Sequence, residues 1–271
     1  MIQIAGFFIV LAVVFGGLLI SGGPAIMSAL PFELALICGA AFGTLLIGNS
    51  PRTVGQALGG FAAAIRGARW QRDDYTNLLQ TLHDLTSDLF AANPRLLRDD
   101  DATQMICDSF RLMALDPSAM AQADARLHDT VASLVEARQR AVSALHTLAD
   151  ALPALGIVAA VLGIIKTMGV IDQSPAILGA MIAAALLGTF LGVFLAYGLV
   201  GPIANRFGQV VEEEALYLDT IRTVLAGFAE GLAPRTAVEL ARSALPAELR
   251  PDIGALDNAL MVTRLSSQKA A

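Results

Sequence analysis

The feature that most constrains this chain is a pair of apolar runs between residues 150 and 202, joined by a short polar turn from Asp172 to Pro175. Each run is long enough to cross a hydrocarbon core of about 30 Å, which takes roughly 20 residues at helical rise. Both runs mix many Gly and Ala residues and one Thr each with their Leu and Ile, where a lipid-facing anchor would be mostly Leu, Ile and Phe. Because small residues let helix backbones approach closely in lipid, the pattern predicts two tightly packed membrane helices.

The small residues recur at helical spacing, which places them on one face of each predicted helix. The two stripes are Pro153, Gly156, Ala160, Gly163 and Thr167 in the first run, and Ala180, Ala184, Gly188, Gly192 and Ala196 in the second. One interpretation is a close-packed hairpin and nothing more. The other is that Pro153 and Thr189 face a partner helix or an ion path.

Composition places the chain in a membrane. Of its 271 residues 55% are hydrophobic and 15% charged, and the mean hydropathy is +0.63, whereas soluble domains average about 25% charged residues. The net charge of −6 is spread out, so no nucleic-acid surface is expected. Two isolated cysteines and three scattered histidines predict neither a disulfide nor a metal site. No nucleophile–base pair or cofactor motif stands out, so we expect neither an enzyme nor a cofactor.

Two further membrane helices are predicted near the N-terminus, over residues 4–20 and 32–48, with a turn at 21–31. The expected fold is therefore an all-α polytopic membrane protein with four transmembrane helices and a helical cytoplasmic domain. The expected divisions are 1–48, 49–152, 153–200 and 201–271. Glu33 is predicted at the mouth of the second helix, as a hydrated acid or an N-terminal cap, so no run is expected to hold a well-buried carboxylate.

The polar segment between the two pairs of membrane runs, residues 49–152, is predicted to form a series of helices. Ser50-Pro51 predicts the start of an amphipathic helix that reaches Ile65. Further helices are expected over 78–89, 96–115 and from residue 118 into the membrane through Pro153. After the last membrane run, Pro202 is expected to bend the helix or to mark its exit from the bilayer.

Charge predicts the orientation. The short connections at 21–31 and 172–175 carry no Lys or Arg, whereas Arg52, Arg66, Arg69, Arg72 and Arg206 flank the other ends of the membrane runs. Basic residues favour the cytoplasmic side. Residues 49–152 and both termini are therefore expected in the cytoplasm, with the short connections in the periplasm of a bacterial inner membrane.

Five stretches of the sequence together resemble one family. They are VFGGLLISGG (14–23), PFEL (31–34), ADALPALGIVAAVLGIIKTMG (149–169), LGAMIAAALLGTFLGVFLAYGLVGPIA (178–204) and APRTAVELAR (233–242). These stretches are similar to the A subunit of the flagellar motor stator (MotA), in the wider group that includes TolQ and ExbB. The resemblance implies five such subunits around two B subunits, whose single transmembrane helices each carry a proton-binding Asp. Ion flow would then turn the ring and push a rotor ring protein.

The resemblance also implies roles for individual residues. Pro153 would stand beside the partner's Asp and Thr189 would present a hydroxyl to it. By helical spacing, Thr167 with Pro153, and Ala185 and Gly192 with Thr189, are expected along the same path. Pro202 would be a hinge at the cytoplasmic end of the fourth helix. Neither Pro153 nor Thr189 titrates near neutral pH, so a partner must carry the proton.

Two further expectations follow from the hairpin. Sodium-driven relatives often carry a Thr-Thr pair where this chain has Gly188-Thr189, so the transported ion is expected to be H⁺. The small-residue stripes would give the ring a smooth sliding surface. Bulky residues at Gly192 or Ala185 are then expected to stall rotation while the complex stays assembled.

The chain departs from the family in its cytoplasmic loop. A segment that carries a rotor-contacting Arg and Glu is missing, because NLLQTLHDLTSD leads directly to LFAANPRLL. Arg66, Arg69, Arg95 and Arg98 are candidate substitutes for rotor contact, although ordinary solvated surface accounts better for most of them. The missing segment keeps open a TolQ/ExbB-like transducer of proton-motive force, and the small-residue stripes alone would also suit a membrane scaffold. Four membrane helices favour the stator.

Overall fold

The computed structural model describes residues 2–21, 24–67, 70–87, 99–115 and 123–270, and every regular element in these ranges is a helix. The chain divides into two compact units. The first contains residues 1–67 and 137–210, and the second contains residues 68–136 and 211–271. Each unit is described by itself below.

The first unit holds the apolar helices. They are α1 (Ile2–Ser21), α2 (Pro24–Gly48), the later part of α6 (Ala123–Met168), α7 (Pro175–Phe194) and the start of α8 (Gly201–Ala229). Among the described residues three helices are long and apolar enough to cross a membrane, in the stretches Ile26–Gly48, Ala123–Met168 and Pro175–Ala229. Ala5–Ile20 is a shorter apolar helix. The all-helical fold with apolar spans is confirmed, while a fourth crossing by α1 stays a prediction.

The turn predicted over 21–31 is wrong for most of its length. Helix α2 begins at Pro24 and runs through Pro31. A proline is tolerated in the first helical turn, where its missing N–H costs no hydrogen bond, so Pro24 starts this helix instead of keeping the chain in a turn.

Helix α3 (Pro51–Arg66) starts where the sequence predicts. The Ser50 side chain accepts a hydrogen bond from the Thr53 backbone N–H at 3.3 Å, and Pro51 takes the first helical position. The long helix α6 likewise continues through Pro153, as predicted. Both predictions are confirmed because they rest on local signals, a cap and an unbroken helical pattern.

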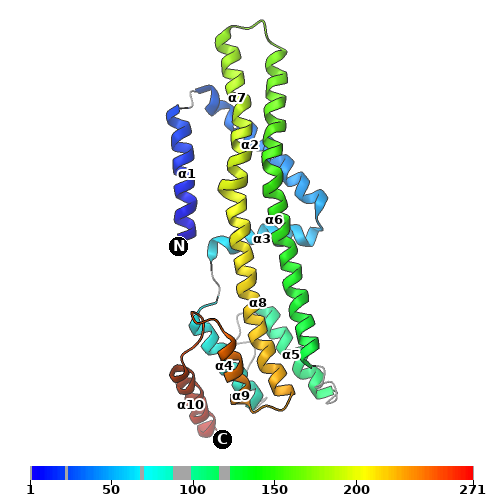
Figure 1. Cartoon of the computed structure of the whole chain (residues 1–271), viewed down its shortest axis with the longest axis vertical. Coiled ribbons are helices and arrows are strands. Elements are labelled where there is room, and N and C mark those ends of the chain that lie inside the picture. The colour runs from blue at the N-terminus through cyan, green and yellow to red at the C-terminus, as the bar shows by residue number, and fades with distance from the viewer. Residues whose placement is uncertain (1, 22–23, 68–69, 88–98, 116–122, 271) are drawn as a thin grey trace. The chain divides into compact units, whose positions relative to one another are not determined.

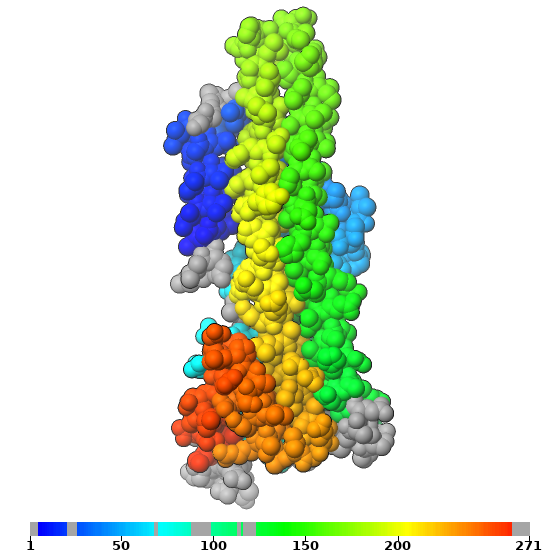
Figure 2. Space-filling view, in the orientation of Figure 1, coloured from blue at the N-terminus to red at the C-terminus, as the bar shows by residue number. Residues whose placement is uncertain are grey.

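Helices α6 and α7 form a hairpin, joined by a short connection (Figure 1). Their surfaces meet without a visible gap in the space-filling view (Figure 2). A Cβ built on Gly156 would lie 2.8 Å from the Gly188 carbonyl oxygen, and one built on Gly163 would lie 2.6 Å from the Ala185 Cβ. The two backbones therefore touch through glycine, the close approach that small residues permit.

The second unit is built around large side chains. It contains α4 (Arg72–Ser87), α5 (Asp100–Leu115), α9 (Pro234–Ala244), α10 (Ile253–Ala270) and the adjoining parts of α6 and α8. Its core includes Tyr75, Leu78, Leu82, Ile106, Ile221 and Leu245. Trp70 stacks on Tyr217 with ring centroids 3.9 Å apart. The helices predicted over 78–89 and 96–115 correspond to α4 and α5.

Candidate ion-path site

Pro153 and Thr189 are both half-buried on the α6–α7 hairpin. Pro153 follows the buried Leu152 inside α6, and Thr189 follows the buried Gly188 inside α7. The missing N–H of a proline frees a carbonyl oxygen one turn earlier in the helix. Each residue keeps part of its surface outside the chain, so a partner helix can reach the Thr189 side chain. The carbonyl freed by Pro153 belongs to Ala149, which is 7% exposed.

Ala185 and Gly192 lie instead between the two helices. Ala185 is 1% exposed, and a Cβ on Gly192 would lie 2.7 Å from the Leu152 carbonyl oxygen and 2.8 Å from the Gly156 Cα. The predicted sliding surface at these two residues is therefore wrong, because the chain uses this face for its own packing. A contribution of Ala185 and Gly192 to ion passage stays a prediction.

The Thr167 hydroxyl is committed to its own helix. Thr167 is 5% exposed, and its Oγ1 donates a hydrogen bond to the Gly163 carbonyl oxygen at 2.9 Å. The oxygen lone pairs can still accept a hydrogen bond. Thr167 can therefore offer an ion path an acceptor but not a donor.

The position of Glu33 contradicts the prediction of a hydrated acid or an N-terminal cap. It lies inside α2, well past the first turn, so it cannot cap that helix. It is 6% exposed, and among the described residues its Oε2 has no hydrogen-bond partner. A Cβ on Gly188 would lie 3.0 Å from this oxygen. The apolar runs therefore do hold a buried carboxylate, packed against the residue that precedes Thr189.

A cavity of about 360 Å³ adjoins Glu33, between α2, α6 and α7. Its walls are mostly apolar, with Leu36, Ala159 and Met181 among the lining residues. Lys166 lines the same cavity and is exposed. A carboxylate and an ammonium group thus border one cavity inside the membrane unit.

Pro202 stands in a continuous helix. Residues Leu195–Val200 form a π-helical segment (η3) between α7 and α8, and the Gly201 backbone N–H donates to the carbonyl of Ala196, five residues earlier. Because Pro202 has no N–H, the wider π turn takes up the mismatch without ending the helix. The helix does not end at Pro202, and a hinge at this position stays a prediction.

Of the four candidate rotor contacts, only Arg66 falls in the described part of the chain, where it ends α3 and is exposed. Arg69, Arg95 and Arg98 lie outside the described residues. No group of three or more His, Cys, Asp or Glu that could hold a metal ion occurs among the residues that the structure describes.

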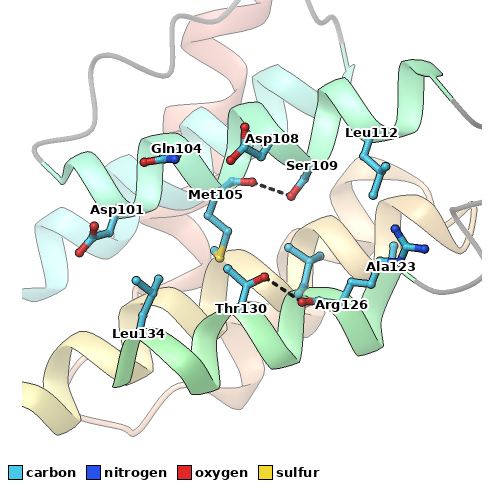
Figure 3. A pocket seen from close by; sticks show the side chains of 11 residues that line it. Asp101, Gln104, Met105, Asp108, Ser109, Leu112, Ala123, Arg126, Thr130 and Leu134 are labelled. Atoms are coloured by element: carbon cyan, nitrogen blue, oxygen red, sulfur yellow. Dashed lines mark hydrogen bonds between the residues drawn. The ribbon is translucent and has the colours of Figure 1, made fainter. Parts of the chain in front are cut away.

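The second unit has a cavity of about 270 Å³ between α5 and α6 (Figure 3). Met105 reaches across it from α5 towards α6. The hydroxyls of Ser109 and Thr130 donate to the carbonyls of Met105 and Arg126, at 2.6 and 2.9 Å. Both hydroxyls serve their own helices, so among the described lining residues neither is set up as a nucleophile.

Comparison with known proteins identifies one family. A family model described as Motility protein A N-terminal matches residues 4–92, and that of the MotA/TolQ/ExbB proton channel family matches residues 100–220. Motility protein A of Escherichia coli (strain K12) is 30% identical over 289 aligned positions, which cover 99% of this chain and 98% of the relative. The chain belongs to the motility protein A family.

Solved structures of the family share its fold. A chain of the Campylobacter jejuni MotAB structure aligns with a TM-score of 0.72 at 19% identity, over 90% of this chain and 95% of that one. A chain of the flagellar MotAB stator complex from Bacillus subtilis aligns with a TM-score of 0.69 at 18% identity and the same coverage. The stator A resemblance drawn from five short stretches is therefore confirmed.

Sequence reasoning missed one residue of this site, the buried Glu33. Its signal was present, because Glu33 lies in the PFEL stretch that carries the family resemblance. An acid within an apolar run is a functional candidate by default. Placing the helix start at residue 32 rather than Pro24 moved Glu33 to the membrane surface and hid that signal.

Proposed function

We propose that this chain is the ion-conducting A subunit of a flagellar stator, coupling proton flow across the inner membrane to torque on the rotor. The observation that carries the proposal is the match to Escherichia coli motility protein A along nearly the whole of both chains. The match to the motility protein A N-terminal model over residues 4–92 favours a stator over a TolQ- or ExbB-like transducer.

The proposed assembly is a ring of five such chains around two B subunits, each with one transmembrane helix that carries an Asp. The half-buried faces of Pro153 and Thr189 would line the boundary with that helix. A carbonyl freed by Pro153 and the Thr189 hydroxyl can order water beside the partner's carboxylate. Four membrane crossings, with both termini in the cytoplasm, belong to the same proposal.

Glu33 is the acid that we add to this path from its burial. An ionised carboxylate without a partner is costly inside a membrane, so Glu33 either holds a proton or meets a cation. Its Oε2 lies 3.0 Å from a Cβ built on Gly188, the residue before Thr189, which supports a role of Glu33 on the same path. We infer that Glu33 passes protons between the partner's Asp and the cavity bordered by Lys166.

The decisive experiment measures proton flux and swimming together, in cells that express the chain with its B subunit. Thr189→Val keeps the shape of the side chain but removes the hydroxyl, and it is expected to lower flux at least tenfold. Thr189→Ser restores the hydroxyl and should recover most of the flux. Full flux in Thr189→Val would remove this residue from the path.

Glu33→Gln tests the second acid with almost no change in volume. We expect the complex to assemble at normal yield while flux and speed fall several-fold. Glu33→Asp, which keeps the titrating group, is the matched control and should recover part of both. Equal flux in all three proteins would assign Glu33 to packing alone.

We propose H⁺ as the transported ion, since Gly188 supplies no hydroxyl where sodium coordination needs several oxygen ligands. Swimming speed should stay constant when sodium is varied at fixed proton-motive force. A steep sodium dependence would contradict the assignment.

Rotor contact is proposed for four arginines, Arg66, Arg69, Arg95 and Arg98. Arg66→Glu and the pair Arg95→Glu with Arg98→Glu should impair motility without lowering ion flux, if the contact is electrostatic. Unchanged swimming would leave these arginines as ordinary surface charge.

A further inference from the structure

The first unit contains a second cavity, of about 660 Å³, which the ion path does not use. It lies between the last turn of α2, the first turns of α3 and the part of α6 around residues 137–151. We call it the α2–α3–α6 cavity. Its volume is in the range of sites that hold whole small molecules, about 300–1,000 Å³, and is much larger than a single ion needs.

The lining of this cavity is basic and polar. Two guanidinium groups, of Arg52 and Arg140, border it, and none of the described residues that line it is acidic. Gln56 and Ser143 add an amide and a hydroxyl. In the described part of the chain, the side chains of Arg52, Gln56 and Ser143 form no hydrogen bond or ion pair, although the Ser143 carbonyl accepts from the Thr147 hydroxyl. The side chains of Arg52, Gln56 and Ser143 can therefore donate to a ligand without breaking contacts of the fold.

The position of the cavity is set by where the apolar span ends. The span in α2 ends at Gly48, which itself lines the cavity. Just before it, Leu46 and Ile47 are 50% and 89% exposed. On α3, Leu58 is 49% exposed. A basic cavity beside exposed apolar side chains at the end of a membrane span matches a ligand with an anionic head and apolar tails.

We propose that the α2–α3–α6 cavity binds one anionic glycerophospholipid, with its phosphate between Arg52 and Arg140 and its acyl chains along the end of α2. Guanidinium groups bind phosphate oxygens by short charge-assisted hydrogen bonds. The headgroup fills the polar cavity, and the tails cover Leu46 and Ile47. The proposal rests on this cavity and not on the ion path.

The experiment uses the whole stator complex, purified in mild detergent and examined by native mass spectrometry with added phosphatidylglycerol or phosphatidylcholine. We expect phosphatidylglycerol to be retained, one lipid per A subunit, and phosphatidylcholine to be lost. Arg52→Gln with Arg140→Gln should lower retention by about tenfold or more, since arginines near the membrane surface attract anionic lipid. Arg66→Gln, which removes an arginine of α3 that does not line the cavity, is the matched control and should retain the lipid.

A second variant separates loss of lipid binding from a folding defect of the double arginine variant. Ser143→Trp fills the cavity without altering charge, at a position that is exposed. It should displace the lipid while yield and gel-filtration profile stay those of the unchanged protein. Retention of phosphatidylglycerol in both variants would overturn the proposal.

Two other outcomes would also overturn it. Inorganic phosphate that competes with phosphatidylglycerol at equal concentration would make this a site for free phosphate rather than lipid. Crosslinking of a Ser143→Cys variant to a neighbouring subunit in the assembled complex would show that protein fills the cavity.

Discussion

The two units of this chain pack their helices through side chains of opposite size. In the first unit α6 and α7 meet through Gly156, Gly163, Gly188 and Gly192, and at Gly156 and Gly192 the Cβ position is blocked by backbone of the facing helix. In the second unit the core is made of Tyr75, Leu78, Leu82 and other large residues. Water rewards the burial of large apolar side chains, whereas lipid does not, so helices in lipid gain most from close backbone contact.

The contrast predicts that the two units fail in opposite ways. Added bulk should break the first, and lost bulk should break the second. The predictions below test this from the largest expected effect to the smallest.

Gly192→Val should have the largest effect. The new Cβ would meet the Leu152 carbonyl oxygen and the Gly156 Cα within 2.8 Å, and backbone atoms cannot move aside as a flexible side chain can. We expect the yield of assembled complex, measured by gel filtration, to fall at least tenfold. Gly179→Ala, in the same helix but with nothing within 4 Å of its Cβ, is the control. Normal assembly with stalled rotation would restore the sliding-surface interpretation.

Leu82→Ala should have the next largest effect, in the second unit. Leu82 is fully buried, so truncation removes apolar contacts and leaves a cavity. The expected loss is about 2–5 kcal/mol of unfolding free energy. It would be followed as a lower melting temperature and faster limited proteolysis of the complex. Leu240→Ala, at a residue that is 51% exposed, should change neither. Equal sensitivity at both positions would mean that this core does not hold the unit together.

Arg242→Gln tests an ionic contact in the same unit. Arg242 is 8% exposed, donates to the Pro251 carbonyl at 2.9 Å, and contacts both carboxylate oxygens of Glu239 at 2.7 and 2.8 Å. Hydrogen bonds to charged groups contribute about 1.5–3 kcal/mol, so a loss in that range is expected. Thermal melting measures it. A loss no larger than that of Arg235→Gln, an exposed pair with Asp257, would contradict the assignment.

The same contact predicts a pH dependence. The hydrogen bond from Arg242 lowers the pKa of Glu239 below the usual carboxyl range. Its stabilisation is therefore present above that range and is lost as the pH falls through the lowered pKa. Because the Glu239 side chain is half exposed, solvent limits the effect to about 1 kcal/mol or less. The stability difference between the unchanged protein and Glu239→Gln should shrink below about pH 4, and a difference that grows in acid would reverse the sign.

Tyr75→Phe should have the smallest effect. Tyr75 is fully buried, and among the described residues its hydroxyl has no hydrogen-bond partner. Burial, with Glu213 and Asp74 nearby, raises the pKa of Tyr75, so the hydroxyl stays neutral. Removing an unpaired buried hydroxyl is expected to change stability by less than about 1 kcal/mol, towards greater stability. A clear loss in melting temperature would reveal a partner for this hydroxyl in the assembled complex.

The sequence by itself determined the elements whose signals are local. The apolar length of 150–202, the cap at Ser50 and the unbroken helical pattern through Pro153 predicted the hairpin, the start of α3 and the continuity of α6. Each depends on residues within a few turns of one another, so no knowledge of the partner surface was needed. The five family stretches likewise sufficed to place the chain among motility proteins.

Only the tertiary structure decided how those elements are used. The glycine stripe could equally have faced a neighbour or the same chain until α6 and α7 were placed together. Glu33 is buried because α2 packs against Gly188, a residue far away in the sequence. Pro202 stays within a helix because a π segment absorbs its missing N–H. These three features depend on contacts between distant segments, and a local sequence pattern does not specify such contacts.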